Sequence, residues 1–209
     1  MLLLINKDFN LSLKKTQKWL EDLGKPYSLK KLSNLDSLDL INNQIKDLSP
    51  LKELFNLSTL SLYDNQIKNL SPLKELSNLV HLNLNENQIK DISPLKELSN
   101  LTFISLYENQ IKDISSLKWL SNLVHVNLHE NQIKDISPLK ELSNLAYLNL
   151  QNNQIKDISP LKKFNNLSYL NLNNNQIVII KGQDSSFLDK HKVKYKTVPD
   201  NLINRELYL

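Results

Sequence analysis

Aromatic and histidine side chains recur in this chain at intervals of 22 residues or multiples of 22, in two series. The first series is His81, Phe103, His125, Tyr147 and Tyr169. The second series is Tyr63, Tyr107 and His129. This concentration is notable because Phe, Trp and Tyr make up only 7% of the chain. Large rings with a polar border are the anchors that protein interfaces use, so the pattern predicts a binding surface.

Carboxylates directly follow the second series of rings and, in the one intervening copy without a ring, Asn85. They are Asp64, Glu86, Glu108 and Glu130, one in each of four successive copies of the 22-residue period. If the copies form neighbouring strands about 4.8 Å apart, these side chains make one like-charged column. Such a column is mildly unfavourable by itself, and a basic surface on a partner would complement it. The simpler alternative is that the rings only suit exposed strands and the acids are only well solvated.

Both features belong to one repeat, whose copies follow each other without insertions. Position 1 of the repeat is Leu35, Leu57, Leu79, Leu101, Leu123, Leu145 and Leu167. A fixed period of this length predicts a solenoid in which each copy supplies one strand and one return segment. Apolar residues at positions 1, 4 and 6 are expected to point inward, and positions 3, 5 and 7 to lie on the outer face of the strand. The rings occupy positions 3 and 7, the acids occupy position 8, and position 5 is small and polar or acidic.

The return segments are almost identical from copy to copy. Asparagine stands at position 9 of all seven copies, and a buried amide repeated once per turn is expected to satisfy backbone groups where the chain leaves the strand. The Ser-Pro pair that follows predicts an N-cap and first residue of a short 3₁₀ turn. Lys-Glu pairs predict a solvated convex side. Trp119 replaces one of these glutamates; it is expected to fold onto neighbouring apolar surface, with an exposed second contact point as the alternative.

The N-terminal residues 1–27 depart from the repeat and predict a helical cap. Its helix is expected to begin at Ser12, to end near Gly24, and to cover the open end of the solenoid. Its predicted apolar face is Leu13, Thr16, Trp19, Leu20 and Leu23. Residues 2–5 are expected to add a short strand.

The repeats are expected over residues 28–177, as seven full copies after a half copy, and residues 178–209 are expected to form a C-terminal cap. Strands are predicted at 177–180 and at 191–198, where lysines alternate with Val193 and Tyr195. The hydrophobic segment 202–209 is expected either to dock or to mediate self-association.

Composition narrows the function further. The chain has no cysteine and only two glycines, so it has neither a thiolate metal site nor a Gly-rich phosphate loop, and no serine elbow is present. His125 and His129 are about 13 Å apart on one strand, too far to share a metal ion. Residues 35–176 carry 13 Lys against 15 Asp and Glu, a net charge of −2, which argues against nucleic-acid binding. We expect no enzyme activity, no cofactor and no metal.

The chain shows no apolar run long enough to span a membrane, and its first residues do not resemble an export signal. These features predict a cytoplasmic protein without membrane partners. A secreted or surface protein is the alternative, if a signal peptide precedes the mature form.

The motif LxxLxLxxNxIxDIxPLxxLxxL, as at residues 79–101, resembles the 22-residue leucine-rich repeats of the internalin family and of phosphatase-regulatory subunits. The resemblance implies an α/β solenoid, a leucine-rich repeat horseshoe with a parallel concave β-sheet, a short 3₁₀ or irregular convex side, an N-terminal helical cap and a C-terminal β cap. It also implies a non-catalytic protein-protein interaction module, an adaptor or inhibitor that uses its concave face. The richness in Lys, Asn and Ile, with a single Arg, predicts a bacterial source, and we expect a monomer. The alternative is a structural role through self-assembly of caps or solenoids.

Overall fold

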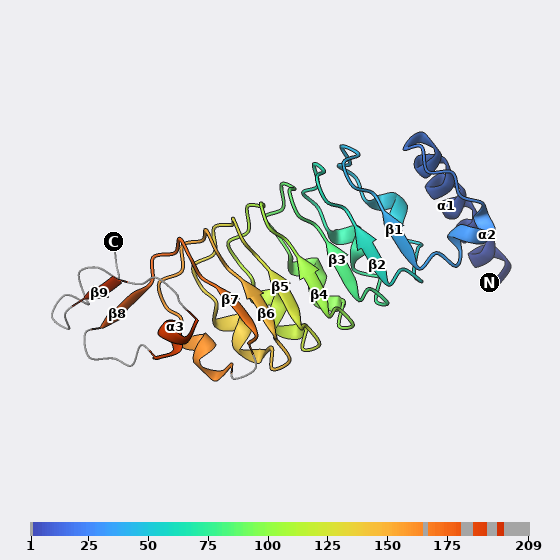
Figure 1. Cartoon of the computed structure of the whole chain (residues 1–209). Helices are drawn as coiled ribbons and strands as arrows, with labels where there is room; N and C mark the ends of the chain where they lie inside the picture. Colours follow the sequence, from blue (N-terminus) through green and yellow to red (C-terminus); the bar gives the residue numbers. More distant parts are fainter. Residues whose placement is uncertain (1, 165–166, 181–185, 192–195, 199–209) are drawn as a thin grey trace.

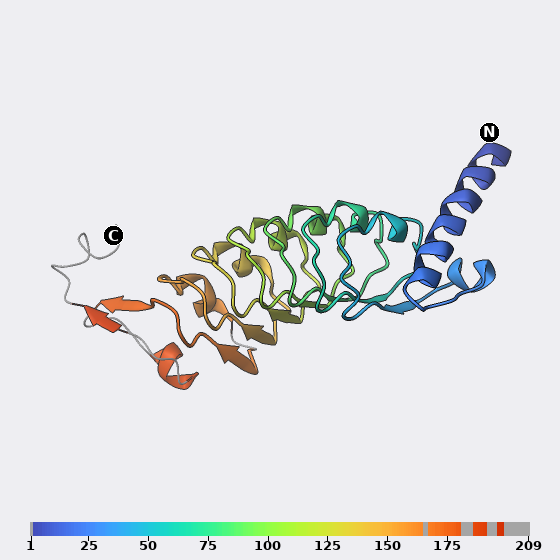
Figure 2. The same cartoon turned by 90° about the horizontal axis from the view of Figure 1, so that it is seen from above.

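Seven three-residue strands form one parallel sheet along the inner side of a curved solenoid (Figures 1 and 2). They are β1 (Ser37–Asp39), β2 (Thr59–Ser61), β3 (His81–Asn83), β4 (Phe103–Ser105), β5 (His125–Asn127), β6 (Tyr147–Asn149) and β7 (Tyr169–Asn171). The computed structural model describes residues 2–164, 167–180, 186–191 and 196–198. Each strand residue pairs with the residue 22 positions later, as His81 does with Phe103. The predicted solenoid and its concave sheet are confirmed.

The core is a narrow column of apolar side chains between the sheet and the convex side. In the second to sixth copies, the residues at positions 1, 4 and 6 are at most 1% exposed. Ile104 and Val126 replace leucine at position 4 without opening the core. Each turn packs only on its neighbours, so the stability of the solenoid is a sum over successive interfaces.

A ladder of buried asparagines closes the end of each strand. Asn109 Nδ2 donates to the carbonyls of Leu84 (3.0 Å), Leu106 (3.1 Å) and Tyr107 (3.2 Å), and its Oδ1 accepts from the N–H of Ile89 at 3.0 Å. The same contacts recur around Asn65, Asn87, Asn131 and Asn153. The amide satisfies backbone groups that the bend would leave buried and unpaired. The predicted structural role of position 9 is confirmed.

Six short 3₁₀ helices line the convex side, opposite the sheet (Figure 2). They are η1 (Ser49–Leu51), η2 (Ser71–Leu73), η3 (Ser93–Glu97), η4 (Ser115–Trp119), η5 (Ser137–Glu141) and η6 (Ser159–Lys163). The prediction that serine caps these turns is wrong. Asp91 Oδ1 accepts from the N–H of Ser93 at 2.8 Å, and five other copies repeat this contact. The side chain two residues upstream, aspartate in five copies and Asn69 in the sixth, provides the cap because serine already lies inside the turn.

The convex side carries a second asparagine ladder, at position 22, which the sequence reasoning did not identify. Asn100 Nδ2 donates to the carbonyl of Ser77 in the preceding copy at 2.8 Å, and equivalent bonds recur in four other copies. Trp119 does not fold onto the surface: it is 60% exposed. Lys118 Nζ lies 5.1 Å from its ring centroid, so the indole is exposed beside a lysine, and its role as a second contact point stays a prediction.

Helix α1 (Leu2–Asp22) crosses the end of the solenoid and is followed by the single turn α2 (Leu29–Leu32) (Figures 1 and 2). The helix is continuous through residues 2–11, so the predicted strand at 2–5 and the predicted start at Ser12 are wrong. A helix can project beyond its docking surface because its backbone hydrogen bonds are internal. The predicted docking face is confirmed, and the buried Thr16 hydroxyl donates to the carbonyl of Pro50 at 2.5 Å.

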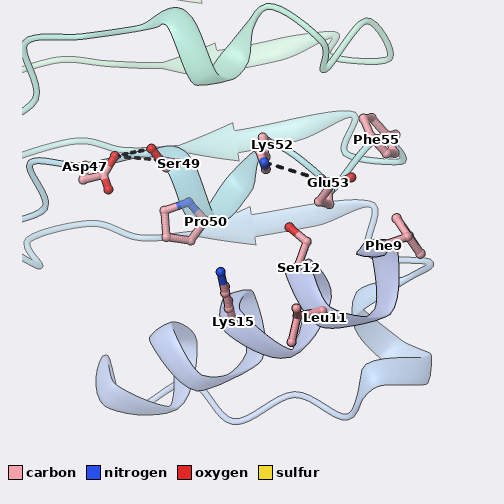
Figure 3. Close-up of a pocket in the computed structure, with 10 residues that line it drawn as sticks. All are labelled: Phe9, Leu11, Ser12, Lys15, Asp47, Ser49, Pro50, Lys52, Glu53 and Phe55. Atoms are coloured by element: carbon pink, nitrogen blue, oxygen red, sulfur yellow. Dashed lines mark hydrogen bonds and ion pairs between the residues drawn. The ribbon is translucent and has the colours of Figure 1, made fainter. Parts of the chain in front are cut away.

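A groove of about 770 Å³ lies between α1 and η1 (Figure 3). The rings of Phe9 and Phe55 stack at one end of it, with centroids 6.5 Å apart. Phe55 stands where the next four copies carry serine. The one copy with phenylalanine at this position is therefore the copy in which this residue contacts the N-terminal helix, through Phe9.

The C-terminal end has its own small sheet of β8 (Val178–Ile180) and β9 (Lys196–Val198), paired in parallel and separate from the seven-stranded sheet (Figure 1). Between them lies α3 (Ser186–Lys190). His191 follows α3 as a turn residue, so the predicted strand from residue 191 is wrong at its start. The predictions for Val193, Tyr195 and segment 202–209 fall outside the described residues.

Among the described helices, none combines the length and apolar character that crossing a membrane requires.

Replacing Asn109 by alanine is expected to lower the free energy of unfolding by about 3 kcal/mol, because the N–H of Ile89 and several buried carbonyls lose their partner. Asn100→Ala removes one exposed hydrogen bond and should cost less than about 1 kcal/mol. Chemical denaturation monitored by circular dichroism measures both. An equal loss of stability in the two variants would contradict the conclusion that the asparagines at position 9 stabilise the bend after each strand.

Candidate protein-binding face

All twelve residues singled out in the sequence lie on the concave side of the solenoid or at its border, where the strands end. The structure arranges them in three rows that run across the strands. The ring row, at position 3, is His81, Phe103, His125, Tyr147 and Tyr169. The second row, at position 7, is Tyr63, Tyr107 and His129. The acid column, at position 8, is Asp64, Glu86, Glu108 and Glu130.

The five rings of the ring row stack on one another. Their centroids lie 5.7, 4.4, 3.8 and 4.3 Å apart in order from His81 to Tyr169, and the last two pairs are within 6° of parallel. Parallel in-register strands produce this stack because they place equivalent side chains about 4.8 Å apart. Ring faces inside the stack are covered by neighbours, so the row presents mainly ring edges and polar atoms outward.

Two tyrosines from different copies hold Glu86. The hydroxyls of Tyr63 and Tyr107 both donate to Glu86 Oε1, at 2.9 and 2.6 Å. The two rings lean toward each other across the intervening copy, with centroids 6.5 Å apart, and Asn85 beneath them is buried. Burial, together with the Glu86 carboxylate, raises the pKa of Tyr107 above its usual value. The Glu86 carboxylate is therefore fixed in position before any partner arrives.

Glu130 is also held, by a different set of groups. His129 Nε2 lies 3.0 Å from Glu130 Oε1, and Asn152 Nδ2 donates to the same oxygen at 2.9 Å. The ring of His129 stacks on that of Tyr107 with centroids 5.8 Å apart. The second row thus links the two fixed carboxylates of the acid column through ring contacts.

Glu108, between these two carboxylates, is exposed. Partial burial and the charges of Glu86 and Glu130 raise its pKa above the usual value. Among the hydrogen bonds and ion pairs of the described residues, none involves its carboxylate. Glu108 therefore carries the charge of the column that is most available to a partner.

The acid column stands on unusual backbone. Asp64, Glu86, Glu108 and Glu130 have φ between +50° and +53°, in the left-handed region that costs ordinary residues about 1 kcal/mol or more. Asparagine tolerates this conformation better, and it occupies position 8 in the first, sixth and seventh copies as Asn42, Asn152 and Asn174. The central copies thus carry acids where the backbone favours asparagine.

The floor between the two rows of rings is formed by the small polar side chains of position 5. Asn83 and Asn149 each accept a hydrogen bond through Oδ1 from the backbone N–H two residues later, at 3.1 Å. Ser105 is only 4% exposed. In the described residues, the buried Ser61 hydroxyl has no hydrogen-bond partner. The floor is therefore low and polar between two raised rows of rings.

Sequence reasoning did not identify Asn85 and Asn152 as parts of this face. The first underlies the tyrosine pair, and the second holds Glu130. Both share columns with the selected residues, at positions 7 and 8, and this shared position is the signal that could have found them. No group of three or more His, Asp, Glu or Cys in the described part of the chain is arranged to hold a metal ion.

Glu108→Asn is expected to raise the free energy of unfolding by about 1 kcal/mol, because asparagine fits the left-handed backbone better and the column loses one charge. Thermal unfolding measures the gain. Glu86→Asn is the matched control: it relieves the same backbone but removes the acceptor of Tyr63 and Tyr107, so its gain should be smaller or absent. A loss of stability in Glu108→Asn would contradict strain at this position.

Burial in the ring row lowers the pKa of His125 below its usual 6.5. The stability contributed by its neutral form is therefore complete above pH 6.5 and is lost as the pH falls toward the lower folded pKa. We expect His125→Phe to flatten the decline of thermal stability across this acidic window. Tyr147→Phe, which keeps the imidazole, should retain the wild-type pH dependence. An NMR titration of His125 with an ordinary midpoint would contradict the expectation.

A family model described as leucine-rich repeats in two copies matches residues 55–97, 99–141 and 143–189. None of the curated proteins matches the chain.

Solved structures give the same fold. An internalin (inlF) from Listeria monocytogenes is 36% identical, with a TM-score of 0.70; the match covers 84% of this chain and 52% of the internalin. Internalin C2 of the same species is 40% identical, with a TM-score of 0.62 and coverage of 68% and 72%. The ectodomain of the Arabidopsis thaliana receptor kinase GASSHO1/SCHENGEN3, in complex with CASPARIAN STRIP INTEGRITY FACTOR 2, is 25% identical, with a TM-score of 0.66 and coverage of 85% and 24%.

The chain thus spans about half the length of the first of these internalins. Over this span, the matches agree with the 22-residue register of the strands. The chain belongs to the leucine-rich repeat proteins, and its repeats resemble those of the internalins.

Proposed function

We propose that this protein is a non-catalytic module that binds a partner protein through its concave face and acts as an adaptor or inhibitor of that partner. The observation that carries the proposal is the alignment of ring row, second row and acid column on one face of the sheet, which no other described element of the chain covers. Rings with a charged border match the composition of protein interfaces. The receptor ectodomain among the similar structures is itself in complex with CASPARIAN STRIP INTEGRITY FACTOR 2.

The chemistry of the face argues against other classes of ligand. Single-stranded nucleic acid and sugars bind by stacking on free aromatic faces, and most ring faces of the ring row are covered by their neighbours. The acid column would repel phosphate groups. A protein surface needs no free ring faces, because its carbonyl and hydroxyl groups can contact the ring edges. Its basic side chains would be attracted by the carboxylates, where phosphates are repelled.

Site-specific photo-crosslinking tests the face directly. A benzophenone amino acid is placed at His81, exposed at the end of the ring row, or at Glu97, exposed on the convex side. Both proteins are irradiated in lysate of the source organism, and crosslinked products are identified by mass spectrometry. We expect a protein other than this chain to be crosslinked to the probe at His81, and no such protein to be crosslinked to the probe at Glu97.

A second variant tests whether the rings are required. Phe103→Ser, Tyr107→Ser, His125→Ser and Tyr147→Ser are combined in the His81 probe protein, and circular dichroism confirms its fold. Capture should fall at least ten-fold, because interface anchors supply most of the binding energy. Capture from Glu97 alone would overturn the proposal in favour of the convex side. Crosslinks only between copies of this chain would favour self-assembly instead.

A further inference from the structure

The concave face has a cross-section suited to one kind of structural element. Rings at positions 3 and 7 stand on either side of the position-5 floor, where Ser105 is almost fully buried. The bonds between copies continue past each three-residue strand, as from the N–H of Glu108 to the carbonyl of His129 at 3.0 Å, so at the extended spacing the backbone positions of the two rows are about 13 Å apart. An α-helix with its side chains is about 10–12 Å across. A helix that runs across the strands, along the solenoid axis, is therefore about as wide as the spacing of the two rows and can rest on the floor with the ring edges along its sides.

The spacing of the acid column also matches a helix. Two steps between parallel strands carry the chain from Glu86 past Glu108 to Glu130, about 9.6 Å at 4.8 Å per strand. On a helix, residues i and i+7 are about 10.5 Å apart, and i+3 or i+4 lies between them on the same face. On an extended chain, three side chains facing one way span about 13 Å. The helix matches the column within about 1 Å, whereas the extended chain misses it by about 4 Å.

The charge of the column is not neutralised by the protein's own lysines. The lysine ion pairs that the structure describes lie within α1 or join convex lysines to convex glutamates. Glu86 and Glu130 are pre-oriented by uncharged or weakly basic groups, the tyrosine hydroxyls and His129. Three carboxylates in register thus face solvent beside rings that can cover the stems of long basic side chains.

We propose that the partner enters this face as an α-helix that lies along the solenoid axis and presents Lys or Arg at i, i+3 or i+4, and i+7 to Glu86, Glu108 and Glu130. The proposal rests on the proposed function and adds the shape and charge of the contacting element. Glu108, which no side chain of the described chain holds, is the residue that determines preference for the central basic side chain.

Two synthetic peptides of identical composition test the match. Both are alanine-based helices of about 18 residues with three arginines; one places them at i, i+4 and i+7, and the other distributes them around the helix. Fluorescence anisotropy measures their affinity for the full chain at low salt, where charge pairs are least screened. We expect the matched peptide to bind at least ten-fold more tightly. Equal affinities would overturn the proposal, because unspecific attraction to a negative surface does not depend on register.

Variants of the protein locate the contact. Glu108→Gln should weaken the matched peptide about five-fold or more, whereas Glu97→Gln, which removes an exposed convex charge, should leave its affinity unchanged. Equal effects of the two variants would overturn the proposal.

The crosslinking experiment separates this inference from the proposed function. If the protein captured through His81 contacts the face with a loop or an extended strand, the helix proposal is overturned and the binding face stands. If nothing is captured through His81 while a convex probe captures a partner, the proposed function fails. A captured basic helix supports both.

Discussion

The buried asparagine at position 9 is the interaction on which the rest of the molecule depends. Its amide bonds to carbonyls of its own copy and of the preceding one, and it accepts the N–H that follows the preceding bend, as at Asn109. Each copy is thereby tied to its neighbour at the same point. A single inserted residue would misplace the amide and leave several buried groups unpaired. The constant 22-residue period follows from this requirement.

A constant register brings the variable positions of successive copies into line. Because every copy repeats the same backbone, side chains at positions 3, 7 and 8 fall into straight rows whatever their identity. His81 and Tyr169, 88 residues apart in the chain, thus become the two ends of one stack of rings. The bonds that hold neighbouring copies together repeat without using these side chains, as at Asn109 and Asn131, so residues at these positions can differ from copy to copy without loss of the fold.

The fold and the membership of the three rows were predictable because both depend on period and alternation. Contacts between copies were not. Tyr63 and Tyr107 can share Glu86 because their rings tilt toward each other across Asn85. The spacing of residues in a sequence does not indicate the direction in which a side chain tilts. The full length of α1 was missed because residues 2–5 are four consecutive apolar residues, a run too short to tell a helix from a strand. The capping role of Asp91 was missed because serine followed by proline matches the usual residues of an N-cap and a first helical position.

The acid column shows where the molecule departs from the most stable choice. Asparagine at position 8 suits the left-handed backbone at both ends of the solenoid, yet the central copies carry Asp64, Glu86, Glu108 and Glu130 there. Backbone strain disfavours the three glutamates, since aspartate tolerates this conformation much as asparagine does, and like-charge repulsion disfavours all four acids. Residues that lower stability cluster at functional sites, where a ligand offsets their cost. The same strained positions lie beside the second row of rings, so strain, charge and aromatic surface coincide in the central copies, where we propose that the partner binds.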